Sequence, residues 1–153
     1  MKISWTFYHK SEFWYWIIFG AAFIGLLTSG YLWYEYSLPT PIGCSIIAGC
    51  EQVRVSDYSK LFGVSLPIYG TTFYLLLAGF ASTLSWNRRK WKYEPLLLLG
   101  FTGTGFIMSA YFTYLEIFVI KAICQWCVIS AVCAVLCFGA AAEVYIISRG
   151  AKD

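Results

Sequence analysis

Two cysteines separated by two residues are the most reactive feature of the sequence, Cys124-Gln125-Trp126-Cys127. The chain from Cys124 to Tyr145 is apolar apart from three polar residues, and as a helix it would be about 33 Å long, against about 30 Å for the hydrocarbon core of a bilayer. The pair therefore falls in the first turn of a predicted membrane helix, where unpaired N–H groups and the helix dipole favour a thiolate. This position predicts a redox pair at one face of the membrane.

A second pair of cysteines, Cys44 and Cys50, lies in a polar segment rich in proline and glycine. The five residues between them include Ala48-Gly49, a turn-forming pair, and make a loop small enough to bring two Cα atoms within about 7 Å, as a disulfide requires. The segment from Ser56 to Gly63 follows, and its capping residues predict a short helix along the membrane surface, with Leu61 and Phe62 facing the apolar side. The sequence thus predicts a second, loop-borne redox pair.

The composition defines the setting of these cysteines. Of 153 residues, 59% are hydrophobic and only 12% are charged, whereas soluble domains carry about a quarter charged residues. We expect an all-α integral membrane protein of one domain, a bundle of four transmembrane helices with a short extracytoplasmic surface helix. The net charge of +3 does not indicate nucleic-acid binding, because the basic residues cluster at membrane borders. The predicted spans cover about 13–34, 66–86, 95–114 and 124–145, with an outer loop over about 35–65 and one domain over 1–153.

The distribution of lysine and arginine predicts the orientation. Eight of the eleven lie at the N-terminus, in the turn between the second and third spans, or in the C-terminal tail. Since positive residues stay inside, both termini are expected in the cytoplasm and all four candidate redox cysteines on the outer face of the plasma (inner) membrane, where disulfides persist. Cys133 and Cys137 lie deep in the last span, about 240° and 280° around the helix from Cys127, and are expected to act as small apolar residues.

Two cysteine pairs on one face can pass electrons by thiol–disulfide exchange, and the electrons then need an acceptor. The sequence has no haem-binding or flavin-binding pattern, which favours a lipid-soluble quinone of the ubiquinone or menaquinone type. Glu35 and Glu116, near the outer ends of the first and third spans, are interpreted as solvated interfacial carboxylates, although an acid near a quinone could also shuttle protons.

Taken together and in order, these motifs resemble the vitamin K epoxide reductase family, in its bacterial and archaeal disulfide-forming branch. The resemblance is carried by Cys44-x5-Cys50, by the segment from Ser56 to Gly63 with Pro67 and Gly70, and by Ala122 to Ala131 around the C-x-x-C. The DsbB type of disulfide generator also has four spans and two cysteine pairs, but it carries its C-x-x-C first.

The resemblance implies an enzyme, a quinone-dependent thiol oxidoreductase, and roles for individual residues. Cys44 would meet the partner's thiol, Cys50 would pass electrons to Cys124, and Cys127 would reduce the quinone. Vertebrate members carry a tyrosine where this chain has Ala131, which favours plain quinone reduction over epoxide reduction. Many bacterial relatives carry a fused thioredoxin-like domain, so a separate thioredoxin-like (DsbA-type) partner is expected here. The residues that the resemblance implies around the quinone are Ser56, Ser59, Phe62 and Phe112.

Two other interpretations of the four outer cysteines remain open. They could bind zinc as four thiolates, although zinc sites usually combine two tight C-x-x-C turns and no metal is expected here. They could also form two structural disulfides in a protein without catalytic activity, in which case they would resist mild reduction.

Overall fold

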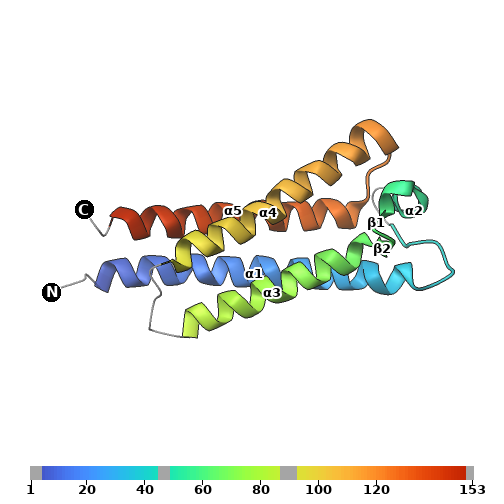
Figure 1. Ribbon diagram of the computed structural model, residues 1–153. Coiled ribbons are helices and arrows are strands. Elements are labelled where there is room, and N and C mark those ends of the chain that lie inside the picture. The colour runs from blue at the N-terminus through green and yellow to red at the C-terminus, as the bar shows by residue number, and fades with distance from the viewer. Residues whose placement is uncertain (1–4, 45–48, 87–92, 151–153) are drawn as a thin grey trace.

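Four long helices run side by side along an elongated molecule, with both termini at one end (Figure 1). The computed structural model describes residues 5–44, 49–86 and 93–150. Helix α1 packs against α3 and α5, and α4 packs against α5. The predicted basic turn at 87–92, the charged termini at Lys2 and Lys152, and Ala48 lie outside the described residues. The long helices are α1 (Trp5–Tyr36), α3 (Leu66–Trp86), α4 (Glu94–Tyr114) and α5 (Gln125–Gly150).

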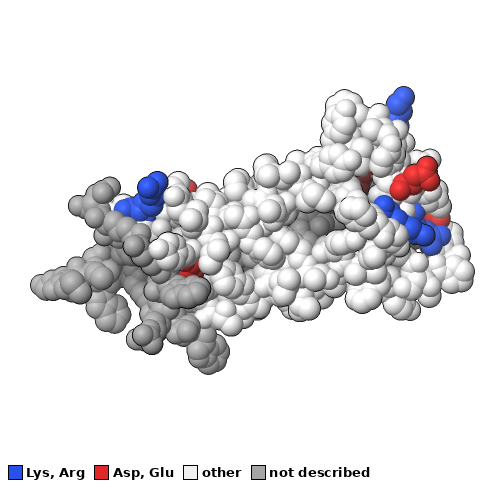
Figure 2. Space-filling model, viewed as in Figure 1, with Lys and Arg blue, Asp and Glu red and all other residues white. Residues whose placement is uncertain are grey.

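Three of the described helical segments are long and apolar enough to cross a membrane: Ser11–Tyr36, Glu94–Ile120 and Gln125–Gly150. On the face shown in Figure 2, charged side chains gather at the two ends of the molecule, and uncharged residues cover the surface between them. The fold is therefore an all-helical membrane bundle. The first and last helices extend beyond the predicted spans, because helical structure continues into the polar flanks.

Small residues allow the close packing of α1 against α3. A Cβ atom on Gly25 would lie 2.5 Å from the Tyr74 ring, and one on Gly70 would lie 3.2 Å from Cβ of Ser29. Ala21, Gly25 and Ser29 recur every four residues on α1, a spacing that lines one helix face with small side chains and allows close approach of a second helix. Gly25 and Ser29 lie at the contact with α3.

The segment between α1 and α3 differs from the prediction. Its helix is α2 (Cys50–Val55), which begins at the second cysteine, and only the single 3₁₀ turn η1 (Asp57–Ser59) forms within the predicted surface helix. Strands β1 (Lys60–Leu61) and β2 (Val64–Ser65) follow as an antiparallel hairpin. Phe62 and Gly63 both have positive φ angles, 52° and 81°, as the two-residue turn of a tight hairpin requires. This turn replaces the predicted helix end.

The predicted connector after α4 is also helical. Leu115–Ile120 forms a π-helical segment, η2, that continues α4 and ends at Lys121, which has a left-handed φ of 57°. A π-helix is wider than an α-helix and occurs frequently at functional sites. The segment brings the chain directly to the C-x-x-C at the start of α5.

Candidate functional site: two cysteine pairs beside a membrane cavity

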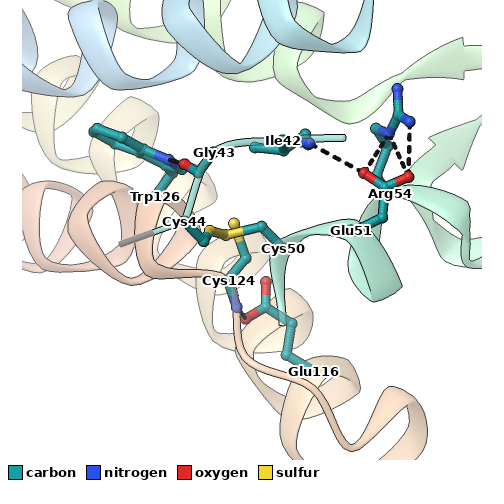
Figure 3. The surroundings of a disulfide bond; sticks show 9 residues. All are labelled: Ile42, Gly43, Cys44, Cys50, Glu51, Arg54, Glu116, Cys124 and Trp126. Atoms are coloured by element: carbon teal, nitrogen blue, oxygen red, sulfur yellow. Dashed lines mark hydrogen bonds and ion pairs between the residues drawn. A yellow bond between two sulfur atoms is a disulfide. The ribbon is translucent and has the colours of Figure 1, made fainter. Parts of the chain in front are cut away.

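Cys44 and Cys50 form a disulfide, with Cα atoms 6.3 Å apart. The loop before Cys44 is held against α2 by two polar contacts. The Glu51 carboxylate accepts the backbone N–H of Ile42 at 3.2 Å (Figure 3). The Arg54 guanidinium, which pairs with Glu51 at 2.7 Å, donates to the backbone oxygen of Leu38 at 3.1 Å. The Arg54 guanidinium holds the pKa of Glu51 below its usual value. These contacts fix the loop that carries Cys44 next to α2, which begins at Cys50.

The second pair lies at the start of α5, as predicted. Cys124 directly precedes the helix, and its carbonyl oxygen accepts the N–H of Val128 at 3.0 Å. Cys124 and Cys127 are both free thiols. The Cys127 thiol and the backbone N–H groups of Cys127 and Trp126 donate toward the Cys124 sulfur, and these contacts lower the pKa of Cys124 although burial opposes the shift. The pair thus has the thiolate-favouring geometry expected from the sequence.

The two pairs meet in one buried cluster at the end of the bundle where α1 finishes and α5 begins (Figure 1). Cys50 is 1% exposed and Cys124 is 2% exposed, and both belong to this cluster together with Ala122. Figure 3 shows the Cys124 side chain pointing toward the Cys44–Cys50 disulfide. The start of α2 closely approaches the backbone segment before α5, because a Cβ on Gly49 would lie only 2.6 Å from the backbone oxygen of Ile123. The fold therefore places the disulfide next to the free thiol pair.

Trp126 covers the loop that carries Cys44. Its indole Nε1 donates to the carbonyl oxygen of Gly43 at 3.3 Å, and its ring lies 4.7 Å from that of Tyr31 on α1. The contact with Gly43 attaches the loop that carries Cys44 to the helix that carries Cys127.

Glu116 lies beside the thiol pair, on the π-helical segment. The carboxylate accepts the backbone N–H of Cys124 at 3.1 Å, and Glu116 lines the same cavity as Cys127. The residue is 5% exposed, so the interpretation as a solvated interfacial carboxylate was wrong. An acidic residue within an apolar stretch is a signal of function that the sequence already contained.

A cavity of about 360 Å³ opens beneath the thiol pair, between α3 and α4, and Figure 2 shows the surface hollowed in this region. Its wall is largely apolar, and the Cys127 side chain contributes to it together with the Glu116 carboxylate. Mostly apolar cavities of this size with a few polar groups are typical of sites for small molecules. The wall also includes Tyr36, Val53, Tyr58, Leu61, Pro67, Tyr69, Phe73, Tyr74, Ser109, Phe112, Thr113 and Ser130, among others.

Of the four residues predicted to surround a quinone, only Phe112 lies on the cavity wall. The Ser56 hydroxyl donates to the carbonyl oxygen of Val53 at 2.7 Å. Ser59 is buried but does not line the cavity, and Phe62 is 94% exposed at the tip of the hairpin. The hairpin turn explains the difference at Phe62, because it directs this side chain away from the bundle.

The sequence did not identify the four tyrosines on the wall, Tyr36, Tyr58, Tyr69 and Tyr74. The Tyr74 hydroxyl donates to the backbone oxygen of Ser130 at 2.6 Å and thereby links α3 to α5 one turn beyond Cys127. Tyr36 lines the wall at the end of α1. Tyrosines are common at membrane borders, so sequence alone could not separate these four from the other eight.

The two remaining cysteines lie away from this site. Cys133 and Cys137 are buried free thiols in the core between the helices, and the Cys137 thiol donates to the backbone oxygen of Ile18 at 3.8 Å. Within the part of the chain that the structure describes, no three His, Cys, Asp or Glu side chains cluster so that they could hold a metal ion. The Cys44–Cys50 disulfide also differs from the four thiolates that a zinc site would need.

A helical membrane bundle with a disulfide beside a thiol pair defines the class of membrane thiol–disulfide oxidoreductases. Residues 16–142 match the model of the vitamin K epoxide reductase family, and the chain belongs to this family. The resemblance seen in the cysteine motifs is thereby confirmed. Comparison with curated proteins gives no match.

Proposed function

We propose that this protein reoxidises a separate thioredoxin-like thiol protein and passes the electrons through its two cysteine pairs to a quinone. The activity would support disulfide formation outside the cytoplasm. The observation that carries the proposal is the buried cluster in which the Cys44–Cys50 disulfide, Cys124 and the cavity wall at Cys127 follow one another. Each exchange in such a chain needs only a thiolate next to a disulfide.

The cycle proceeds by exchange steps that balance. A partner thiolate attacks Cys44 and releases Cys50, and the second partner thiol then resolves the mixed disulfide, which leaves the partner oxidised. Cys50 attacks Cys124 of an inner disulfide and releases Cys127, and Cys44 then restores the outer disulfide. The reduced inner pair finally transfers two electrons and two protons to the quinone, giving hydroquinone. The state in the structure, an outer disulfide and an inner dithiol, corresponds to the protein just before this last step.

The proposed membrane arrangement has four spans, with both termini in the cytoplasm and the cysteines on the outer face. The fourth span would be α3, which is not among the three candidate spans described above. Its 21 residues would extend about 32 Å, enough for the hydrocarbon core. It contains no charged residue, and the hydroxyls of Thr71 and Thr72 donate to carbonyl oxygens of its own preceding turn. Figure 1 supports the arrangement, since α3 starts at the end of the bundle where α1 finishes.

The cavity is the proposed quinone site. A ring held there could pack on Phe112 and reach both the Cys127 sulfur and the polar groups of the wall. Comparison of Phe112→Ala with Phe62→Ala tests this assignment, because only the first residue lines the cavity. The quinone KM should rise in the Phe112 variant and stay unchanged in the Phe62 variant.

The activity itself is tested with purified protein in lipid nanodiscs, a reduced thioredoxin-like protein and a soluble ubiquinone analogue. Loss of the quinone absorbance should require the thiol protein and should stop in Cys44→Ala and Cys127→Ala. A wild-type protein that leaves ubiquinone and menaquinone analogues unreduced would refute the proposal. Thiol trapping in the same samples separates this outcome from a structural role, in which the Cys44–Cys50 disulfide would resist the reduced partner.

A further inference from the structure

We propose that the Glu116 carboxylate is the proton carrier between the Cys127 thiol and the quinone. This inference rests on the proposed function and assigns a catalytic role to the buried carboxylate. Three independent features of the structure support it: the contacts of the carboxylate, its burial, and the backbone segment that holds it.

The contacts place the carboxylate between the thiol pair and the cavity. One oxygen accepts the N–H of Cys124 at 3.1 Å, which holds the carboxyl group at the helical turn that carries Cys127. Glu116 and Cys127 both line the cavity. No other carboxylate of the described residues lines this cavity. A group that transfers a proton must come within hydrogen-bond reach of it in the reacting complex, and this position next to the thiol pair provides for that.

The burial of Glu116 argues against a purely structural origin. Removing a carboxylate from water is costly unless hydrogen bonds compensate for it, and a single backbone N–H could equally be capped by a neutral side chain. The π-helical segment contributes a second indication, because the Glu116 backbone oxygen accepts the N–H of Ala122 at 3.1 Å across the widened turn. This bond fixes the residue between the two cysteines and the cavity.

The proposed step balances. Oxidation of the reduced inner pair to a disulfide releases two electrons and two protons, which convert one quinone to one hydroquinone. Glu116 accepts the Cys127 proton as the thiolate forms and gives that proton to a quinone oxygen, so the carboxylate is restored. The second proton comes from Cys124 or, where Cys124 is already a thiolate, from solvent.

The surroundings of Glu116 allow its titration to be distinguished from that of its neighbours. Two elements contribute titratable groups that act on it, Tyr36 from α1 and the thiols of Cys124 and Cys127 at the start of α5. On α2, Glu51 and Arg54 pair with each other.

The test is a single turnover. The fully reduced protein is mixed with a soluble ubiquinone analogue, and hydroquinone formation is followed across pH. Glu116→Gln keeps an oxygen that can accept the Cys124 N–H but cannot carry a proton. Its rate should fall roughly 100-fold, the lower range for general acid–base catalysis, and the limb of the pH–rate profile due to this carboxyl group should disappear. Glu143→Gln, an exposed carboxylate on α5, is the matched control and should behave as the wild type.

The outcomes separate this inference from the proposed function. Wild-type protein that forms no hydroquinone refutes the proposed function as a whole. A second outcome is that the wild type turns over while the Glu116→Gln rate stays within about threefold of the wild-type rate, which is below any general acid–base contribution. If the pH profile is also unchanged, that result overturns only the role of Glu116. If Glu116→Gln does not fold, as shown by the absence of the Cys44–Cys50 disulfide in peptide maps, Glu116→Asp takes its place. That variant should be slower with the pH limb retained, and a rate and profile equal to the wild type would overturn the inference.

Discussion

The close approach of α2 to the backbone segment before α5 allows a sharp prediction at Gly49. A Cβ there would lie 2.6 Å from the backbone oxygen, 2.7 Å from the nitrogen and 3.1 Å from the carbonyl carbon of Ile123. These are backbone atoms, which cannot rotate away as a side chain could. Non-bonded carbon contacts are optimal from about 3.5 Å, so Gly49→Ala must separate α2 from the backbone at Ile123 by about 0.9 Å.

The displacement acts on Cys50, the next residue, and widens its distance from Cys124. Overpacking of this kind destabilises a protein by about 1–3 kcal/mol, which leaves the bundle folded. A misplacement of about 1 Å can slow a reaction by about 100-fold, so exchange between the two pairs should slow by roughly 10- to 100-fold. Reduction of the Cys44–Cys50 disulfide by an external thiol should keep its rate.

Rapid acid quenching and thiol labelling measure the two steps separately. Gly43→Ala is the matched control, because a Cβ at Gly43 would meet only the Tyr31 hydroxyl at an ordinary 3.8 Å. Equal exchange rates in Gly49→Ala and Gly43→Ala would refute the reasoning, since the close approach at Ile123 would then not control the meeting of the two pairs.

Three further predictions concern single contacts. Tyr74→Phe removes the 2.6 Å hydrogen bond to Ser130 and should lower the free energy of unfolding by about 1 kcal/mol; an unchanged denaturation midpoint in detergent would contradict it. The lowered pKa of Glu51 means that its pairing with Arg54 stabilises the loop above about pH 4.3, the ordinary value, and that this stabilisation is lost as the pH falls through the lower folded value. The rate at which a phosphine reduces the loop disulfide should therefore be lower in the wild type than in Glu51→Gln at about pH 6, and the two rates should converge at about pH 3; a wild-type to variant ratio that does not change with pH would contradict this. Cys137→Ala should leave quinone reduction within roughly twofold of the wild type, as expected for a buried apolar thiol, and a larger loss in the same assay would assign it a redox role.

The sequence predicted the features that depend on periodicity and composition. The apolar runs identified the long helices, and the position of Cys124 and Cys127 at the start of α5 followed from where the last run begins. The packing of α1 at Gly25 is of the same kind, because the four-residue spacing of Ala21, Gly25 and Ser29 is a property of one helix face.

The features that depend on three-dimensional contacts were missed. The hairpin at Phe62 needs two successive positive φ angles, and the phenylalanine at the first of these positions gives no turn signal of the kind that asparagine or glycine would. Glu116 was interpreted as exposed because its distance from the span end suggested water, whereas the π-helical turn buries it beside Cys124. The cavity wall combines residues from separate helices, and sequence patterns within one helix do not show which of them converge.

The central claim, that Cys50 passes electrons to Cys124, is tested most directly by peptide mapping of Cys127→Ala under non-reducing conditions. With Cys127 absent, the Cys124 thiolate can attack the adjacent Cys44–Cys50 disulfide, and no second thiol of its own pair can resolve the product. The account predicts a Cys50–Cys124 link with Cys44 free. A map that contains only the Cys44–Cys50 disulfide, both with and without added quinone and thiol partner, would contradict it.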